Sequence, residues 1–171
     1  MRRNVAAAGA AVFFALAPGV AGGLVPWWLT GWRLRQPFGY ALPLRIIGVL
    51  LAAAGTAVLV HAFVKFVVEG LGTPAPVAPP ERLVIGGPYR YVRNPMYLGV
   101  LAAIGGQALL LWQPVLFWYG LAVAVAVVVF VLGYEQPTLH RQFGAEYEEY
   151  QRAVPGWWPR LRPWRPAPER D

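Results

Sequence analysis

The stretch GGPYRYVRNPMYLG, residues 86–99, leads from a polar loop into a long, mostly apolar part of the chain. Its Asn94-Pro95 pair is typical of a helix start, because asparagine can cap free backbone N–H groups and proline has its φ angle preset. We therefore expect a helix to begin at Pro95, with the Asn94 side chain as its cap and its partially positive end facing the loop.

Two arginines and three tyrosines surround this helix start, namely Arg90, Arg93, Tyr89, Tyr91 and Tyr97. Charged donors, flat rings and free backbone N–H groups together suit a ligand that combines an anionic group with a flat ring. The alternative is that these residues only anchor a helix at a membrane surface, where arginine and tyrosine are common.

The composition indicates an all-α integral membrane protein. Of the 171 residues, 57% are hydrophobic and 13% are charged, whereas soluble domains average about 45–50% and about 25%. The net charge is +7. In a membrane protein such an excess marks loops that face the cytoplasm and anionic lipid, so we expect no nucleic-acid partner.

We expect about four transmembrane helices, since each needs about 20 mostly apolar residues. The expected spans are 5–29, 44–68, 95–112 and 115–134. Only Gln113-Pro114 separates the last two, which predicts a tight antiparallel hairpin. Small residues in the third span should let it approach its neighbours closely. The first span also resembles a signal peptide; we expect it to be retained, with cleavage as the alternative.

Three regions follow from this division: a helix pair over 1–68, a loop, hairpin and lid over 69–160, and a frayed tail over 161–171. The lid is amphipathic, with apolar residues recurring every three or four positions. We expect an interruption near Gly144 and an ion pair between Glu148 and Arg152.

The distribution of lysine and arginine predicts the orientation. Most of them fall at the N-terminus, in the loop before Pro95 and in the tail. The positive-inside rule then gives a multi-pass protein of the cell membrane with both termini and the Asn94-Pro95 corner on the cytoplasmic side.

Glu135 is a carboxylate at the end of the fourth apolar segment. The short hairpin should return it to the level of Asn94. Carboxylates near a span are costly and often functional, so it could hold a ribose hydroxyl pair, an ammonium or a sulfonium. The alternative is an ordinary acid at a helix end. The chain has no cysteine and two histidines, so we expect no thiol nucleophile and no metal site.

The motif GPYRYVRNPMYLG, followed at hairpin distance by Glu135 and FGAEYEEYQRAVP, resembles the isoprenylcysteine carboxyl methyltransferase and phospholipid methyltransferase superfamily of membrane enzymes. The resemblance covers about residues 73–160. It implies use of S-adenosyl-L-methionine without a Rossmann domain, and the chain indeed lacks a strand–GxGxxG–helix unit.

The resemblance also implies roles for individual residues. The cofactor-binding residues would be Leu83, Val84, Tyr89, Asn94, Pro95, Met96, Tyr97 and Glu135. A lipophilic acceptor or membrane lipid would be the substrate. By their chemistry, Arg90 or Arg93 could hold its carboxylate or phosphate, and Glu135 or a tyrosine could accept a proton from an acceptor amine.

The chain departs from the superfamily pattern at three places. Asn94 stands where histidine is common, Gln136 replaces the second glutamate of a pair, and Val131 stands where enzymes acting on prenylated cysteine carry an arginine. The last departure disfavours a prenylcysteine acceptor. The alternatives to a methyltransferase are a membrane reductase with a nicotinamide cofactor and a non-catalytic membrane protein.

Overall fold

The computed structural model describes residue 12 and residues 16–36, 41–70 and 82–165, and this part of the chain contains helices and no strand. The all-α prediction is therefore confirmed. The elements are η1 (Val20–Leu24), α2 (Val25–Thr30), α3 (Leu42–Gly70), η2 (Gly87–Arg90), α4 (Pro95–Leu111), α5 (Pro114–Phe130), η3 (Val131–Glu135) and α6 (Gln136–Ala153).

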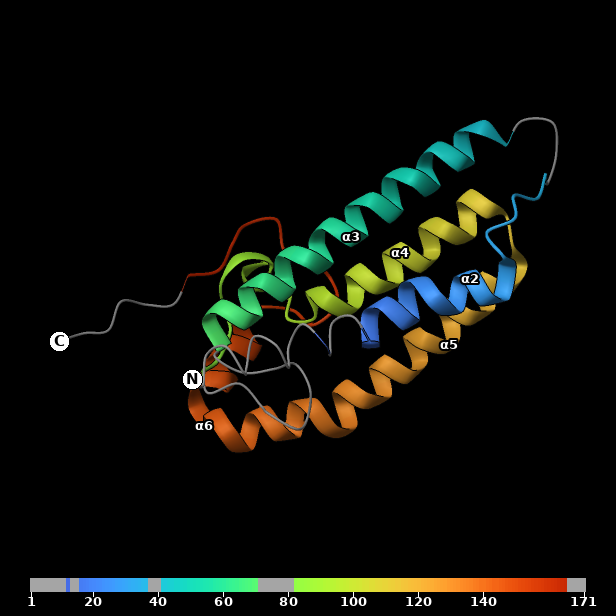
Figure 1. Ribbon diagram of the computed structural model, residues 1–171. Helices are drawn as coiled ribbons and strands as arrows, with labels where there is room; N and C mark the ends of the chain where they lie inside the picture. The colour runs from blue at the N-terminus through green and yellow to red at the C-terminus, as the bar shows by residue number, and fades with distance from the viewer. Residues whose placement is uncertain (1–11, 13–15, 37–40, 71–81, 166–171) are drawn as a thin grey trace.

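Helices α3 and α4 lie side by side along most of their length (Figure 1). Glycines on both helices make this close approach possible. A Cβ atom on Gly55 would stand 2.7 Å from the carbonyl oxygen of Gly99, and one on Gly99 would stand 2.8 Å from that of Gly55. Gly48 and Gly106 meet in the same way further along. The expected close approach of the small residues is confirmed.

Helices α4 and α5 form the predicted tight hairpin. Trp112 ends α4 in the left-handed region at φ 51°, and Pro114 opens α5 directly after Gln113. The Leu116 N–H donates to the Gln113 carbonyl at 2.9 Å, which closes the turn. The start of α4 and the end of α5 therefore return to the same end of the molecule.

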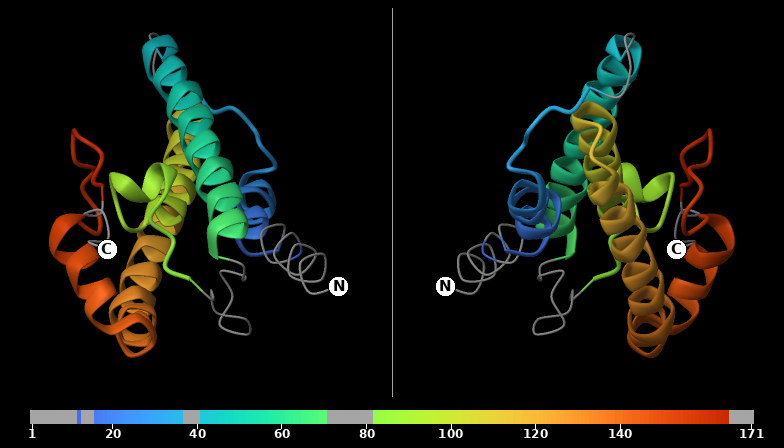
Figure 2. Two further views of the ribbon diagram at one scale, coloured as in Figure 1. Left: turned by 90° about the vertical axis from the view of Figure 1, so that its left-hand side faces the viewer. Right: turned by 90° about the vertical axis from the view of Figure 1, so that its right-hand side faces the viewer.

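The N-terminal segment η1–α2 packs against α4 and α5 (Figure 2). The Gly22-Gly23 pair lies within the π-helical turn η1. Gln107 Nε2 donates to the Gly22 carbonyl at 2.6 Å, and Tyr119 Oη donates to the Ala21 carbonyl at 2.8 Å. The first part of the expected span 5–29 lies outside the described residues, apart from residue 12.

Within the described residues, two helices are long and apolar enough to cross a membrane: Leu42–Glu69, and the continuous helix Pro114–Ala153 through its apolar first half. Helix α4, with 17 residues, is shorter. Large apolar side chains on α3 and α5 point outward, as with Leu50, Trp118 and Val129, which are 63%, 72% and 65% exposed. Such surfaces are favourable in lipid and unfavourable in water.

One end of the molecule collects the segments that carry the sequence motifs. The end of α3, the turn η2, the start of α4 and helix α6 all meet there (Figure 1). Helix α6 bends at Gly144, which has φ 49° and ψ −122°. The predicted interruption at this glycine is therefore confirmed.

Candidate active site at the start of α4

The turn η2 is docked on the last turns of α3. The Gly86 N–H donates to Glu69 Oε2 at 2.9 Å, and Glu69 Oε1 also accepts from Lys65 Nζ at 3.2 Å. Gly87 has φ +55°, and a Cβ there would stand 2.9 Å from Lys65 Cγ. Glycine is needed at this position for both reasons. This contact fixes where the residues leading to α4 are placed.

Tyr97 and Glu135 meet across the hairpin. Tyr97 Oη, on the first turn of α4, donates to Glu135 Oε2 at 2.7 Å, and both residues are half-buried. The prediction that the hairpin brings Glu135 to the level of the Asn94-Pro95 corner is confirmed. A second carboxylate oxygen, Oε1, is free to accept further hydrogen bonds.

A π-helical turn positions Glu135. In η3 the Gln136 N–H bonds to the Val131 carbonyl, five residues back, instead of the usual four. The chain passes without a break from α5 through η3 into α6. Single π turns of this kind are frequent at functional sites, because the extra residue changes the direction of the side chains that follow.

Arg93 ties the loop before α4 to the end of α6. Its Nε donates to the Val154 carbonyl at 2.9 Å, and its Nη1 donates to Tyr147 Oη at 3.1 Å. Its backbone N–H donates to the Pro155 carbonyl at 3.0 Å. Two of its side-chain N–H groups thus hold the lid, and the rest of the guanidinium is left for other partners.

Tyr150 closes the same region from the lid side. Its hydroxyl donates to the backbone carbonyl of Tyr89 at 2.7 Å. The two tyrosines belong to a buried cluster with Val84, Tyr147 and Val154. Burial raises the pKa of the Tyr89 phenol well above its usual value, so this group stays protonated and neutral.

The remaining expected contact residues surround this cluster. Leu83 and Met96 are partly buried and pack against it, while Pro95 is fully buried at the first position of α4. The structure therefore places Leu83, Val84, Tyr89 and Met96 together under the lid, beside the Tyr97–Glu135 pair.

Asn94 differs from the expected helix cap. Its side chain makes no capping hydrogen bond, because its backbone conformation (φ −113°, ψ 51°) is not that of a regular cap. The expectation of a side-chain cap is therefore wrong. Asn94 is 6% exposed, and its Nδ2 is buried without a hydrogen-bond partner among the described residues. Buried amides of this kind are rare and need an explanation such as a ligand or a water.

Arg90 faces a groove lined by α3, the other side of α4 and the C-terminal segment, and neither Tyr97 nor Glu135 lines this groove. The two arginines that the sequence analysis paired thus have different surroundings: Arg93 holds the lid, and Arg90 lines the groove.

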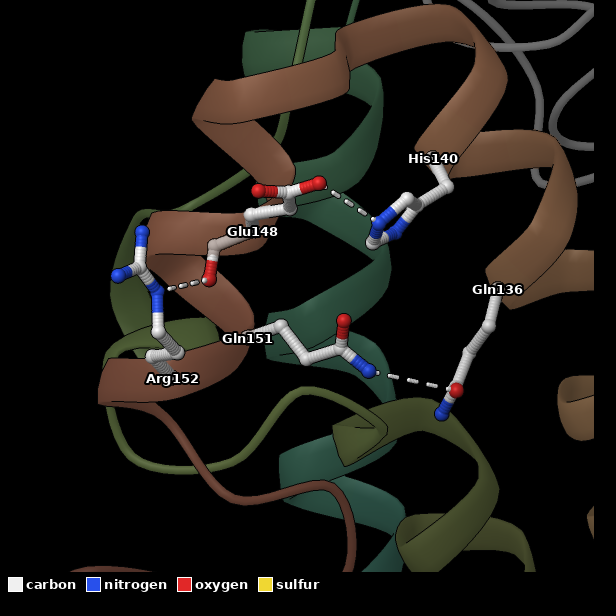
Figure 3. Close-up of polar contacts among 5 residues, drawn as sticks. All are labelled: Gln136, His140, Glu148, Gln151 and Arg152. Carbon is white, nitrogen blue, oxygen red and sulfur yellow. Dashed lines mark hydrogen bonds and ion pairs between the residues drawn. The ribbon is translucent and has the colours of Figure 1, made fainter.

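The lid carries polar contacts that the sequence analysis did not find (Figure 3). His140 Nε2 lies 3.1 Å from Glu148 Oε1, and Arg152 Nε donates to the backbone carbonyl of Glu148 at 3.3 Å. The expected Glu148–Arg152 ion pair is therefore wrong. The bend at Gly144 brings His140 to the Glu148 carboxylate instead.

The segment after α6 is anchored as far as the structure describes it. The N–H groups of Arg160 and Trp164 donate to the carbonyls of Tyr91 and Arg90, each at 3.0 Å. The Trp164 ring also packs on Tyr150, with ring centroids 5.6 Å apart. The expected fraying from residue 161 onward does not hold at Trp164; residues 166–171 lie outside the described part.

The family model described as phospholipid methyltransferase matches residues 44–146, which is more than half of the chain. The chain belongs to the phospholipid methyltransferase family. No curated protein and no solved structure matches it. The expected superfamily is thereby confirmed, and membership identifies the chain as a membrane methyltransferase in broad terms.

The site of this phospholipid methyltransferase family member combines polar groups with an apolar wall. Asn94 offers a buried amide without a partner, and Glu135 offers a carboxylate beside it on the neighbouring helix end. An apolar, tyrosine-rich cluster can enclose a flat ring. Within the described residues no group of three or more potential metal-ligating acids and histidines occurs.

Proposed function

We propose that the protein is an S-adenosylmethionine-dependent methyltransferase that modifies a lipophilic acceptor within the membrane. The observation that carries this proposal is the Tyr97–Glu135 hydrogen bond beside the unpaired, buried Asn94 amide, all under a lid held by Arg93. Family membership supports the reaction type, and this arrangement supports the position that we propose for the site.

The cofactor would be held by residues from three segments. Glu135 would supply negative charge for the sulfonium or acceptors for the ribose hydroxyls, and Asn94 would donate through its free amide. Leu83, Val84, Tyr89 and Met96 would form the apolar wall, with Pro95 and Tyr97 at the helix start. The cofactor itself brings an electrophilic methyl group, so the protein needs to orient, shield and balance charge.

The acceptor would be an apolar molecule with an amine or a carboxylate, such as a phospholipid amine or an isoprenoid acid. For an amine, the carboxylate of Glu135 is the nearest proton acceptor in the site. For a carboxylate, the N–H groups of Arg93 that the lid leaves unused would pair with it. Val131, at the position where prenylcysteine enzymes carry arginine, disfavours a prenylated cysteine.

The site would face the cytoplasm of a four-span protein of the cell membrane. Its end of the molecule, formed by the end of α3, η2, the start of α4 and α6, carries Lys65, Arg82, Arg90, Arg93 and the arginines of α6. Arg33, Arg35 and Arg45 lie at the opposite end, beside the α4–α5 turn: the Arg33 carbonyl accepts from Gln113, the Arg35 N–H donates to the Leu111 carbonyl, and Arg45 donates to the Arg35 carbonyl. The positive-inside rule supports this orientation.

Two measurements test the proposal. Membranes that contain the protein should transfer radiolabelled methyl groups from S-adenosylmethionine into extractable lipid, and the labelled product then identifies the acceptor. Purified protein should be stabilised against heat by S-adenosylhomocysteine. Stabilisation by NADPH instead would favour a reductase, and stabilisation by neither would favour a non-catalytic protein.

A further inference from the structure

A groove of about 670 Å³ runs along the seam between α3 and α4 and ends under η2. Its walls on the two helices are almost entirely apolar or small, with Leu51, Ala54 and Val58 on α3 and Leu98 and Ala102 on α4. From Leu51 to His61 the groove follows α3 for about 15 Å, at 1.5 Å per residue. This length and volume suit a chain-like apolar ligand.

The groove lies on a different side of α4 from the Tyr97–Glu135 pair of the proposed methyl-transfer site, and of the proposed cofactor residues only Pro95 lines it. Its α4 residues, Pro95, Leu98, Gly99 and Ala102, lie on one face of the helix. Tyr97 points from the opposite face, since successive residues of a helix are about 100° apart. The groove and the Tyr97–Glu135 pair are therefore on different sides of α4. Figure 2 shows η2 and the C-terminal segment beside the helix pair, on the side away from η1–α2.

Arg90 supplies a charge at one end of the groove. Its Nε is buried and has no hydrogen-bond partner among the described residues. Its backbone is fixed, because its carbonyl accepts from the Trp164 N–H at 3.0 Å. The acid on the neighbouring turns of α3, Glu69, is already engaged by Lys65 and the Gly86 N–H. The Arg90 Nε–H is thus a buried donor without an acceptor among the described residues, at the mouth of an apolar groove.

We propose that this groove binds one anionic phospholipid of the surrounding bilayer, in addition to the methyl acceptor. Arg90 pairs with the phosphate, and one acyl chain lies along the α3–α4 seam. The positive charge of Arg90 fits an anionic headgroup. Its position also fits, because Arg90 lies at the basic end of the molecule, where lipid headgroups would meet the helix ends. The exposed side chains of Leu51 and Val58 would face the acyl chains.

The same lipid would contact the segment that anchors the lid. Pro159 and Pro163 of the segment after α6 line the groove. Trp164, the residue after Pro163, packs its ring on Tyr150 of α6. Lipid bound in the groove would thus stabilise the anchored form of this segment.

Native mass spectrometry of the full chain, purified in detergent with phosphatidylglycerol or phosphatidylcholine, tests the proposal. We expect wild-type protein to retain phosphatidylglycerol preferentially. Arg90→Gln should lower the apparent affinity for phosphatidylglycerol about fivefold, the value of one arginine at an anionic lipid surface. It should lower the affinity for phosphatidylcholine less, because the choline ammonium of that lipid already neutralises the phosphate. Arg82→Gln is the matched control, because Arg82 is exposed at the same end but does not line the groove.

A second pair of variants tests the groove without touching the charge. Ala54→Phe fills the groove and should reduce retention of phosphatidylglycerol, whereas Ala57→Phe, on the neighbouring side of α3, should not. Equal retention by wild type and Arg90→Gln would overturn the proposal, and so would equal behaviour of the two phenylalanine variants. If Arg90→Gln fails to fold, the phenylalanine pair decides. None of these measurements depends on methyl transfer.

Discussion

Tyr97 and Glu135 lie 38 positions apart in sequence and form a 2.7 Å hydrogen bond. Their meeting was predictable, because a short break at Gln113-Pro114 forces two helices of similar length to return together. The same reasoning could not show which groups would be unpaired. Asn94 was expected to cap α4, and its buried, unpartnered amide depends on a local φ/ψ that no sequence pattern specifies.

Removing either partner of this bond should weaken cofactor binding. Tyr97→Phe and Glu135→Gln are each expected to reduce the affinity for S-adenosylhomocysteine about tenfold or more, because a hydrogen bond to a charged group contributes about 1.5–3 kcal/mol. Thermal-shift titration or calorimetry measures the change. Tyr134→Phe and Glu149→Gln are the controls, since both side chains are exposed. Unchanged affinity in both site variants would contradict the placement of the cofactor.

Arg93 should matter mainly through the lid. Arg93→Gln removes the hydrogen bonds to the Val154 carbonyl and Tyr147 Oη, and each such bond to a charged group is worth about 1.5–3 kcal/mol. We expect faster hydrogen exchange in the second half of α6, measured by mass spectrometry. In the Arg141→Gln control, the lost side chain is exposed and donates to Thr138 Oγ1 at 3.3 Å, so exchange in the second half of α6 should be unchanged. Equal hydrogen-exchange rates in the two variants would contradict the role of Arg93 in holding the lid.

At the scale of elements, the sequence predicts the α3–α4 contact correctly but not the ion pairing in α6. Glycine and alanine in the third apolar segment predicted close packing, and the seam confirms it. Charge spacing predicts an ion pair between Glu148 and Arg152, and this pair does not form. The bend at Gly144 places His140 beside the Glu148 carboxylate instead. Glu148 and Arg152 lie in one continuous segment after the bend, so their spacing suits an ion pair, but spacing alone cannot show that the bend brings His140 to the same carboxylate.

The seam makes a sharp stability prediction. A Cβ on Gly106 would stand 2.6 Å from the Gly48 carbonyl oxygen, whereas one on Gly105 would meet only Leu51 Cδ2 at 3.8 Å. Gly106→Ala should therefore destabilise the protein by about 1–3 kcal/mol, and Gly105→Ala should be neutral or stabilise it by up to about 1 kcal/mol. Thermal unfolding in detergent compares the two. Equal melting temperatures would show that the helices are further apart than described.

At the scale of the whole molecule, composition alone was sufficient for the helical class, and family membership agrees with a membrane protein. The anchoring of the C-terminal segment could not be predicted. It depends on the N–H groups of Arg160 and Trp164 reaching the carbonyls of Tyr91 and Arg90, and backbone groups are the same in every sequence. A Pro- and Arg-rich tail was therefore expected to be frayed.

The proposed orientation can be tested because the natural chain has no cysteine. A single cysteine at Glu149 should be protected from a membrane-impermeant maleimide in intact cells and react after the membrane is opened. A single cysteine at Arg33, at the other end of the molecule, should react in intact cells. Both side chains are exposed. The reverse pattern would place the candidate site on the outer face and exclude cytoplasmic S-adenosylmethionine as its cofactor.

The wide turn η3 holds one residue more than an ordinary α-helical turn. Deleting the exposed Gly133 would let it close to a regular α turn, so that Tyr147 and Tyr150 keep facing Arg93 and Tyr89 while Glu135 loses the position that the wider turn gives it. Substitution of Gly133 by alanine meets no neighbouring atom within 4 Å and keeps the number of residues in the turn. At this point of the chain, length is therefore under stricter control than identity.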